Sequence, residues 1–320
     1  MFLDDNVKFK LILGLGNQDI KSAFDMALLY AHAGVRFFDI APGVLPDLKR
    51  CLVKAGYNVD EFTLCVSVAT LGDIHGRKAH ISESVCSGCA ICLKNCPQFA
   101  ISKNKKTGKC EVDNKKCIGC GFCKKAMNCY AISFEYGNSG IVSLNSLVDA
   151  DVIPDMVELH ASVSDKKQII RDFKDILSVF KGDISVCVNK KQFSLNNVID
   201  LLKELRGLYE ISNPKGRFFV QADGASMNGG AKDVESTLEC ILFAKELIPY
   251  GFNLIISGGT NAKTPKMLYE TIEDEILNGA KMPIIGYGTY ARNLINGTNT
   301  NEAIIMAEEL LRGTEKYSKV

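Results

Sequence analysis

The sequence predicts an α/β protein, a (β/α)8 barrel of the TIM type with a cysteine-rich segment inserted after its third strand. Three observations lead to this prediction. A short apolar run, a turn and an amphipathic helix recur along the 320 residues, and eight such apolar runs can be counted. The runs are continuously apolar, which is typical of parallel strands buried on both faces, and eight strand–helix units make a closed barrel. A doubly wound open sheet is the alternative, because a sequence does not reveal strand order.

The predicted strands are short runs rich in Val, Ile, Leu and Phe that end at turn-forming or polar residues. LILGLG, FFDIA and TLCVSVA precede the cysteines, and MVELHA resumes the series after them. The last four runs are ISVCV, FFVQA, LIIS and PIIGY. In order, the predicted strands cover residues 11–16, 37–41, 63–69, 156–161, 184–188, 218–222, 254–257 and 283–287.

Helical patterns follow the strands, with apolar residues recurring at every third or fourth position. Gly34, Gly56 and Gly182 each follow such a pattern, at the place where a glycine commonly ends a helix. The third crossover is the weakest, because only residues 143–149 offer a helix there. The predicted helices cover residues 20–33, 45–55, 143–149, 166–180, 195–208, 231–247, 265–277, 290–296 and 301–312.

The cysteine-rich segment begins with CSGCAICLKNCP, which has the spacing C-x2-C-x2-C-x3-C-P. That spacing is typical of the bacterial ferredoxin run that binds a [4Fe–4S] cluster. A second block, CIGCGFCKKAMNC, repeats the first three cysteines and adds a fourth after five residues instead of three. The two blocks hold eight of the thirteen cysteines: Cys86, Cys89, Cys92, Cys96, Cys117, Cys120, Cys123 and Cys129.

Two [4Fe–4S] clusters are therefore the expected metal cofactors. In two-cluster ferredoxins the fourth ligand of each cluster comes from the other run. The expected ligand sets are Cys86, Cys89, Cys92 and Cys129 for one cluster, and Cys117, Cys120, Cys123 and Cys96 for the other. A zinc site needs only two C-x2-C pairs, and a disulfide framework suits short secreted chains. Cys110 is a rival ligand, but its surroundings, GKCEVD, favour a packed thiol on a hairpin strand.

Composition excludes several classes of partner. The chain has 38 Lys and Arg against 37 Asp and Glu, and this balance argues against a nucleic-acid partner. The first residues carry acids where a signal peptide needs bases, and no run of 18 apolar residues predicts a membrane span. Many thiols without a secretion signal favour the cytoplasm. Basic runs at 102–109 and 113–117 indicate a solvated hairpin, with a docking patch for a redox partner as the alternative.

Barrel chemistry takes place at the C-terminal ends of the strands. The cysteine-rich segment leaves the third strand at that end, so we expect it to lie over the barrel mouth. Polar residues near the strand ends are candidates for the mouth, with core or linker roles as the alternative. These candidates are Asp39, Asp73, His75, Arg77, His80, Glu158, His160, Asn189, Lys190, Gln221 and Asp223.

The loops after the seventh and eighth strands, SGGTNAKT and GYGTYARN, occupy the place where barrels often bind phosphate. Their glycines permit close backbone approach, and their Thr and Arg side chains are donors. A third glycine-rich loop, ADGASMNGG, either caps a helix or binds an anion. The predicted ligand is FMN or another phosphate-bearing molecule, with ordinary turn chemistry as the alternative. The predicted cofactor-binding residues are Gly258, Gly259, Thr260, Gly288, Thr289, Arg292 and Asp223.

These motifs give the chain a resemblance to the cyanobacterial light-dependent period protein (LdpA) family of iron–sulfur proteins. The resemblance rests on HGRKAHIS before the first cysteine block, on both blocks, and on VELHA, VQADGASMNGG, ISGGTNAKT and GYGTYAR after them. It implies two clusters on the eight cysteines and a redox-sensing role. In that family the role is described as informing the circadian clock; the redox role is carried over here, and the circadian one is not.

The sequence thus predicts three segments. Residues 1–74 hold the first three strands and a linker, residues 75–140 form a ferredoxin-like insertion, and residues 141–320 complete the barrel and resemble the LdpA C-terminal region. The expected function is electron transfer or redox sensing through two [4Fe–4S] clusters, detected by a partner protein. The alternative is an oxidoreductase that holds a flavin or phosphorylated substrate at the mouth and uses the clusters as an electron relay.

Overall fold

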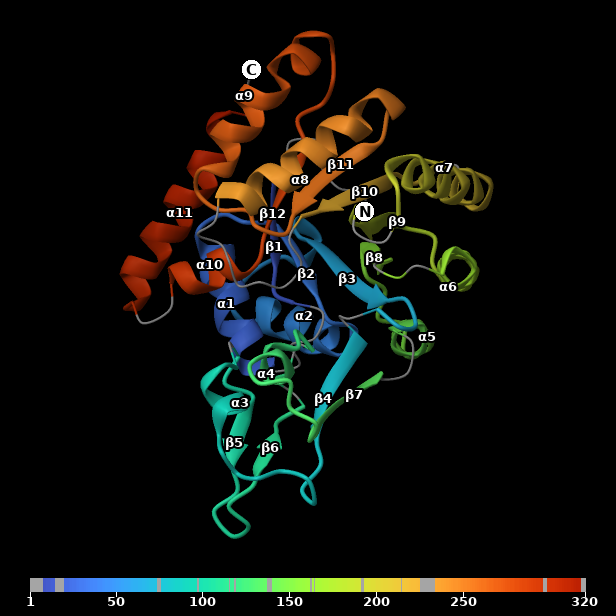
Figure 1. Ribbon diagram of the computed structural model, residues 1–320. Helices are drawn as coiled ribbons and strands as arrows, with labels where there is room; N and C mark the ends of the chain where they lie inside the picture. Colours follow the sequence, from blue (N-terminus) through green and yellow to red (C-terminus); the bar gives the residue numbers. More distant parts are fainter. Residues whose placement is uncertain are drawn as a thin grey trace.

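A closed barrel forms the body of the protein, and a smaller lobe projects from it (Figure 1). In Figure 1 the lobe is the cyan and green part below the barrel. The computed structural model describes residues 8–14, 20–73, 76–96, 98–114, 116–117, 119–136, 140–161, 163, 165–190, 193–213, 215–224, 234–295 and 298–317.

The barrel is made of parallel strands in the order β1-β12-β11-β10-β9-β8-β3-β2. Its strands are β1 (Phe9–Ile12), β2 (Phe37–Ile40), β3 (Thr63–Ala69), β8 (Met156–His160), β9 (Asp183–Val188), β10 (Phe218–Asp223), β11 (Asn253–Ser257) and β12 (Ile284–Tyr287). Because β1 pairs with β12 as well as with β2, the sheet closes. The predicted barrel is confirmed, and the open-sheet alternative is wrong.

Helices surround the barrel and bury their apolar faces against the outer side of the strands. They are α1 (Ile20–His32), α2 (Leu45–Lys54), α5 (Gly140–Asp149), α6 (Lys166–Val179), α7 (Leu195–Ser212), α8 (Val234–Leu247), α9 (Thr264–Leu277), α10 (Thr289–Leu294) and α11 (Thr300–Lys316). Short 3-10 helices join them: η1 (Pro42–Val44), η2 (Val59–Glu61) and η4 (Ile248–Tyr250). Among the described residues, no helix combines the length and apolar character needed to cross a membrane.

The predicted element boundaries differ from the structure by a few residues, and one difference matters. Strand β1 begins at Phe9, not Leu11, because the charged residue Lys10 lies inside the barrel and is neutralised there. The weak third crossover is helix α5, which begins three residues before the predicted start. Residues 15–16, 231–233 and 296 of the predicted elements lie outside the described residues.

The lobe comprises residues 76–136 and has a small core of its own, to which its cysteines contribute. Strand β4 (Arg77–Ile81) pairs antiparallel with β7 (Ile132–Tyr136), and β5 (Ile101–Lys103) pairs antiparallel with β6 (Cys110–Val112). Two single-turn helices, α3 (Ile91–Lys94) and α4 (Phe122–Lys125), complete it. The predicted hairpin position of Cys110 is therefore confirmed.

The lobe is attached to the C-terminal rim of the barrel, beside the end of β8. The backbone N–H of Thr70, directly after β3, donates to the carbonyl oxygen of His160 over 3.0 Å. The linker then turns back, since Gly76 N–H bonds to Asp73 O, and a Cβ built on Gly76 would lie 3.3 Å from the Cβ of Ala69. The lobe thus departs from the functional end of the barrel, as its place in the chain predicts.

Candidate functional site

The barrel interior is filled in layers, because every second residue of a strand points inward. The layer at the N-terminal ends is apolar: Phe37, Cys65, Met156, Phe219, Ile255 and Ile284. Two residues further along the strands lies a polar layer: Lys10, Asp39, Ser67, Glu158, Ser185 and Gln221. The layer nearest the mouth contains His160, Cys187, Asp223 and Ser257. The inner side chains therefore change from apolar to polar toward the end where barrels carry out chemistry.

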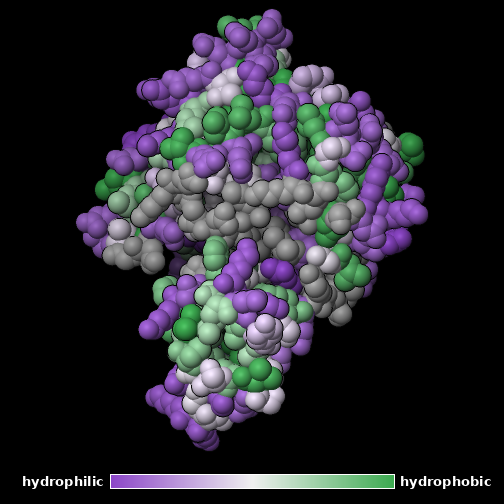
Figure 2. Space-filling view, in the orientation of Figure 1, coloured by the Kyte–Doolittle hydropathy of each residue, from purple (hydrophilic) through white to green (hydrophobic). Residues whose placement is uncertain are grey.

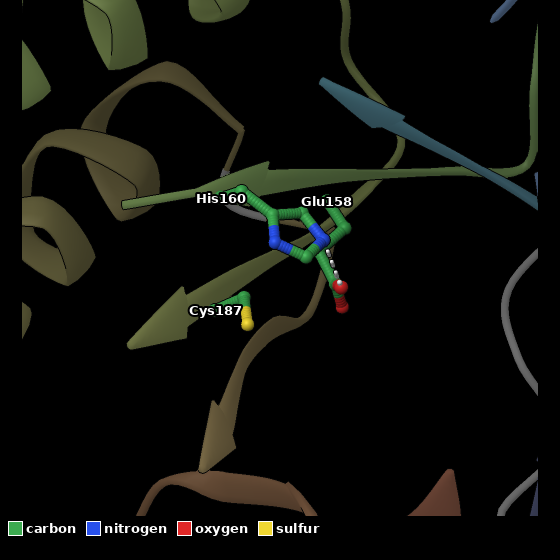
Figure 3. Close-up of side chains that lie close together, drawn as sticks. All are labelled: Glu158, His160 and Cys187. Carbon is green, nitrogen blue, oxygen red and sulfur yellow. Dashed lines mark ion pairs between the residues drawn. The ribbon is translucent and has the colours of Figure 1, made fainter. Parts of the chain in front are cut away.

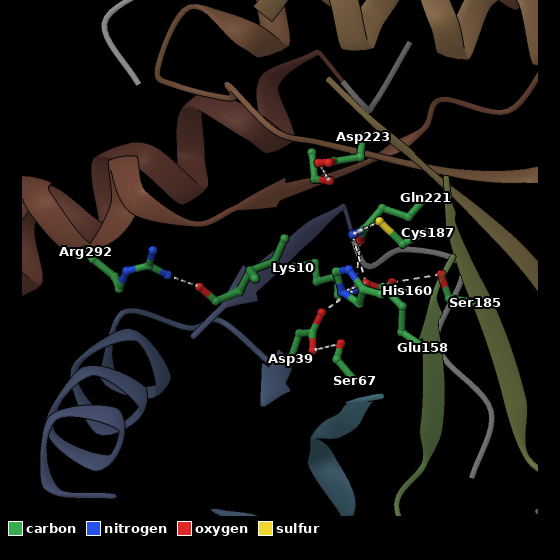
Figure 4. A network of polar contacts seen from close by, with 12 residues as sticks. Lys10, Asp39, Ser67, Glu158, His160, Ser185, Cys187, Gln221, Asp223 and Arg292 are labelled. Carbon is green, nitrogen blue, oxygen red and sulfur yellow. Dashed lines mark hydrogen bonds and ion pairs between the residues drawn. The ribbon is translucent and has the colours of Figure 1, made fainter. Parts of the chain in front are cut away.

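Lys10 is the centre of the polar layer (Figure 4). Its Nζ lies 2.7 Å from Asp39 Oδ2, 2.6 Å from Glu158 Oε2 and 2.8 Å from Gln221 Oε1, so that all three donors of the ammonium have acceptors. Ser67 donates to the other oxygen of Asp39. Four strands are therefore connected through one buried cation.

The charges of this layer follow from burial and from Lys10. Burial by itself would lower the pKa of Lys10, but Asp39 and Glu158 raise it well above its usual value. Burial would raise the pKa of Glu158, but Lys10 and His160 lower it to about 2. Burial raises the pKa of Asp39, against the opposing effect of Lys10. Lys10 is thus held as an ammonium and is not an amine nucleophile.

Glu158, His160 and Cys187 form a compact group where the polar layer meets the mouth (Figure 3). His160 Nε2 lies 3.3 Å from Glu158 Oε1. Burial would lower the pKa of His160, but Cys187 and Glu158 raise it well above its usual value. Burial raises the pKa of Cys187 to about 12, which keeps its thiol neutral at pH 7. Glu158 is therefore the anion that favours the protonated ring.

The mouth candidates fall into two groups. Five of them lie in the inner layers: Asp39, Glu158, His160, Gln221 and Asp223. Asp73 and Asn189 are buried near the rim. The expectation was wrong for the other described candidates, because Arg77 and His80 lie on β4 of the lobe and Lys190 pairs with Glu246 on the surface. His75 lies outside the described residues.

Sequence reasoning missed Lys10, Ser67, Ser185 and Cys187. Each lies inside an apolar run, where a single polar residue resembles an interruption rather than a site. A usable signal was the spacing of two residues: Ser185 and Cys187 alternate with Ile184 and Val186 along one strand. Such alternation places both on the same inward face.

The loops predicted to bind phosphate are closely tied to the rest of the barrel. Thr260 Oγ1 donates to the Gly286 carbonyl over 2.6 Å. Arg292 donates to Ile12 O over 2.8 Å and to Thr289 Oγ1 over 2.9 Å, and burial lowers its pKa to about 10. Such bonds within the protein agree with the alternative prediction, that these loops are ordinary barrel turns.

The glycines of these loops are required by packing. Gly258 and Gly259 have φ of +76° and +123°, a region that favours glycine. A Cβ on Gly258 would collide with the carboxylate of Asp223, which accepts a bond from Ser257 Oγ over 3.0 Å. Gly288 is the exception, because a Cβ built on it would lie no closer than 3.9 Å to the neighbouring side chains and backbone. The cofactor-binding role of these residues stays a prediction.

The eight cysteines of the two blocks line two separate cavities of the lobe. The larger cavity, about 340 Å³, has four of them on its wall: Cys86, Cys89, Cys92 and Cys129. The smaller cavity, about 20 Å³, has the other four: Cys96, Cys117, Cys120 and Cys123. In each cavity three cysteines come from one block and the fourth comes from the other. Cys110 also faces the larger cavity and is a fifth thiol there.

The two cysteine loops have the same local geometry. Gly88 and Gly119, each two residues after the first cysteine of its block, have φ of 75° and 71°. Ala90 and Gly121, directly after the second cysteine, have φ of 63° and 85° and precede the single-turn helices that carry the third. A positive φ at Ala90 is unfavourable for a residue with a Cβ. The two cysteine loops therefore share one backbone conformation.

Backbone N–H groups point at the cysteine sulfurs. Cys86 Sγ accepts from the N–H groups of Gly88 and Cys110, both over 3.4 Å. Burial would raise the pKa of Cys86, but these two donors lower it below its usual value. Cys96 and Cys117 each accept one such bond over 3.3 Å. Each cavity thus has four thiols on its wall, and at least one of them accepts a backbone N–H bond, which is a donor set that iron–sulfur clusters take.

Three basic side chains donate hydrogen bonds to backbone carbonyl oxygens of the same loops. Arg77 Nε donates to Gly119 O over 2.8 Å, and its guanidinium lies 4.2 Å from the centroid of the Phe134 ring. Lys78 and Lys109 donate to the carbonyl oxygens of Cys117 and Cys86. The lobe therefore places positive charge directly on the backbone that carries the thiols.

Comparison with known proteins gives one family and a set of distant structural likenesses. The light dependent period A C-terminal domain matches residues 147–316, just over half of the chain. No curated protein matches the chain. A native KDPGal structure has 8% identity and a TM-score of 0.45 over 100% of both chains. Dihydrodipicolinate synthase from Agrobacterium tumefaciens str. C58 has 8% identity and a TM-score of 0.44, over 98% of this chain and 79% of its own. Likenesses at this level support no inference about chemistry.

Proposed function

The chain belongs to the light dependent period A C-terminal domain family, and we propose that it is an iron–sulfur redox protein whose lobe binds two [4Fe–4S] clusters. The observation that carries the proposal is the division of the eight cysteines between two cavities, four to each. In each set the fourth cysteine comes from the other block, which is the ligand pattern of two-cluster ferredoxins.

The local geometry supports this proposal over a zinc site. Zinc bound by four thiolates needs no repeated positive-φ loop followed by a helical turn, and no third cysteine at x2 spacing. Here both loops have that shape, and N–H groups bond to the sulfurs as they do around clusters, where such bonds adjust the reduction potential. The lobe, with its two antiparallel strand pairs and two single-turn helices, is ferredoxin-like in this respect.

The smaller cavity is the more demanding of the two sites. Its volume of about 20 Å³ leaves less room for a cubane between its cysteines. The larger cavity, about 340 Å³, already has room between its cysteines. We therefore expect the first cluster to bind more tightly, and the second to be lost first during exposure to chelators.

The surface of the lobe fits electron exchange with an acidic partner protein. Val85, Met127 and Tyr130 line the larger cavity and are exposed, Tyr130 to 90%, and Cys89 is exposed beside them. Apolar side chains gather on the lobe among polar ones (Figure 2). Residues 76–136 contain 11 Lys and Arg against 4 Asp and Glu, so a partner with the opposite charge is steered to this surface.

The proposal is tested by preparing the full chain without oxygen and measuring iron, sulfide, absorption and EPR spectra. We expect about eight irons per chain. Cys129→Ser should lower the iron content toward four, whereas Cys110→Ser, a buried cysteine facing the same cavity, should leave it at eight. An iron content near four per chain in the wild type would contradict the second cluster. Equal losses of iron in the two variants would show that Cys110 is a ligand.

Flavin extraction from the same preparation tests the alternative function. An oxidoreductase with FMN at the barrel mouth would release about one flavin per chain. The bonds of Thr260 and Arg292 to the barrel do not favour that alternative. If one flavin per chain were found, the clusters would instead be assigned the role of relaying electrons to the barrel.

A further inference from the structure

We propose that Glu158, His160 and Cys187 bind one divalent transition metal ion, zinc or ferrous iron, at the mouth of the barrel. One oxygen, one ring nitrogen and one sulfur from these residues all lie within 4.8 Å of one another. The three side chains come from the adjacent strands β8 and β9 and lie close together (Figure 3). This site is separate from the two cysteine cavities of the lobe.

The separations within the group suit a tetrahedral metal. Two nitrogen or oxygen ligands about 2.1 Å from a zinc ion lie about 3.4 Å apart in a tetrahedron. The observed distance between His160 Nε2 and Glu158 Oε1 is 3.3 Å. Sulfur and nitrogen ligands of a tetrahedral zinc ion lie about 3.6 Å apart, so the sulfur of Cys187 needs to approach by at most about 1.2 Å from the 4.8 Å limit.

The donor types restrict the metal. Metal binding displaces one proton from the Cys187 thiol and one from the His160 ring, and both protons are released to solvent. The resulting thiolate and imidazole favour zinc or ferrous iron over magnesium or calcium, which prefer oxygen ligands. Three protein ligands from sulfur, nitrogen and oxygen also leave a fourth position for water or another oxygen ligand, as in catalytic zinc sites. Since His160 and Cys187 lie one layer above Glu158, that position faces the barrel mouth.

The groups around the three residues already orient them as a metal site requires. Lys10 and Ser185 donate to Glu158 Oε2 over 2.6 and 2.8 Å, which leaves Oε1 facing His160. Gln221 Nε2 bonds to Glu158 Oε1 over 2.8 Å and to Cys187 Sγ over 3.5 Å. One amide thus positions two of the three ligands, which is the usual task of groups behind metal ligands.

The location connects the site to the lobe. The carbonyl oxygen of His160 accepts the N–H of Thr70, the first residue of the linker to the lobe. Gly76, where the lobe begins, lies against Ala69, the strand neighbour of His160. A metal held here therefore lies below the attachment of the lobe and not at a remote end of the barrel.

The test uses the full, cluster-loaded chain, prepared anaerobically and equilibrated with Zn²⁺ alone or Fe²⁺ alone. We expect about one metal ion per chain beyond the cluster iron. X-ray absorption at the zinc edge should show one sulfur with nitrogen and oxygen neighbours. In the iron experiment, Mössbauer spectra should show one mononuclear high-spin ferrous ion.

Three variants sharpen the result. Cys187→Ser and His160→Gln should each weaken metal binding at least tenfold, whereas Cys240→Ser, which removes a buried thiol on helix α8, should leave it unchanged. A wild-type chain without the additional ion would overturn the proposal. So would zinc with four sulfur neighbours, which would place it among the lobe cysteines. The metal content and the spectra of the wild-type chain test the proposal even if a variant fails to fold.

Discussion

Replacing Lys10 by Met is the most direct test of how the barrel interior is held together. The ammonium has three contacts between 2.6 and 2.8 Å, to Asp39, Glu158 and Gln221, and Lys10 is fully buried. Its removal leaves two buried carboxyl groups without their cation. Breaking a buried charge pair in this way costs about 3–5 kcal/mol.

The assay is urea unfolding followed by far-UV circular dichroism at pH 7 and 25 °C. The matched control is Lys190→Met, because Lys190 also pairs with a carboxylate over 2.6 Å but both partners are more than a third exposed. An exposed pair contributes about 1 kcal/mol or less. We therefore expect a loss of free energy of unfolding at least threefold larger for Lys10→Met than for the control.

The pH dependence supplies a second criterion. In the wild type, Glu158 has a pKa of about 2 in the folded state, so its stabilising effect is present above the unfolded value of about 4.5 and is lost as the pH falls toward 2. Without Lys10 the folded pKa values of Asp39 and Glu158 should rise, which favours the variant at low pH. The two proteins should thus converge in stability on acidification. A penalty below 1 kcal/mol, or one independent of pH, would refute the reasoning.

Two further substitutions test the loops at the barrel mouth. Gly259→Ala should destabilise the barrel by about 2 kcal/mol or more in urea unfolding, because φ is +123° and the new Cβ would lie 2.7 Å from Ser236. The control is Gly251→Ala, where φ is +66° and no atom lies near the new Cβ. This control should cost about 1 kcal/mol. Arg292→Met removes the 2.8 Å bond to Ile12 O and should cost about 1–3 kcal/mol, and an unchanged urea midpoint would contradict the structural role assigned here.

The architecture was predictable because each of its signals is local. Continuous apolar runs mark buried parallel strands, and glycines after periodic segments mark helix ends. The third strand, Thr63–Ala69, was predicted to the residue, and α5 was predicted despite its short pattern. Closure could only be inferred from the count of strands, since the pairing of β1 with β12 joins residues about 275 positions apart.

The buried site was less accessible to prediction. Glu158, His160 and Gln221 were proposed because they stand at strand ends. Lys10 and Cys187 were not, because a polar residue inside an apolar run is uninformative until its neighbours in space are known. Arg292 was proposed for a phosphate because of its donor groups, and the structure adds that these groups bond to Ile12 and Thr289.

By itself, the sequence determined the barrel, the point of insertion and the eight cysteines in their two spaced blocks, because these depend on periodicity and spacing along the chain. Only the tertiary structure decided that Lys10 neutralises Asp39 and Glu158, and that Glu158 and His160 meet Cys187. The physical reason is that closing the barrel brings together side chains from strands far apart in sequence, and burial then makes their charges interdependent.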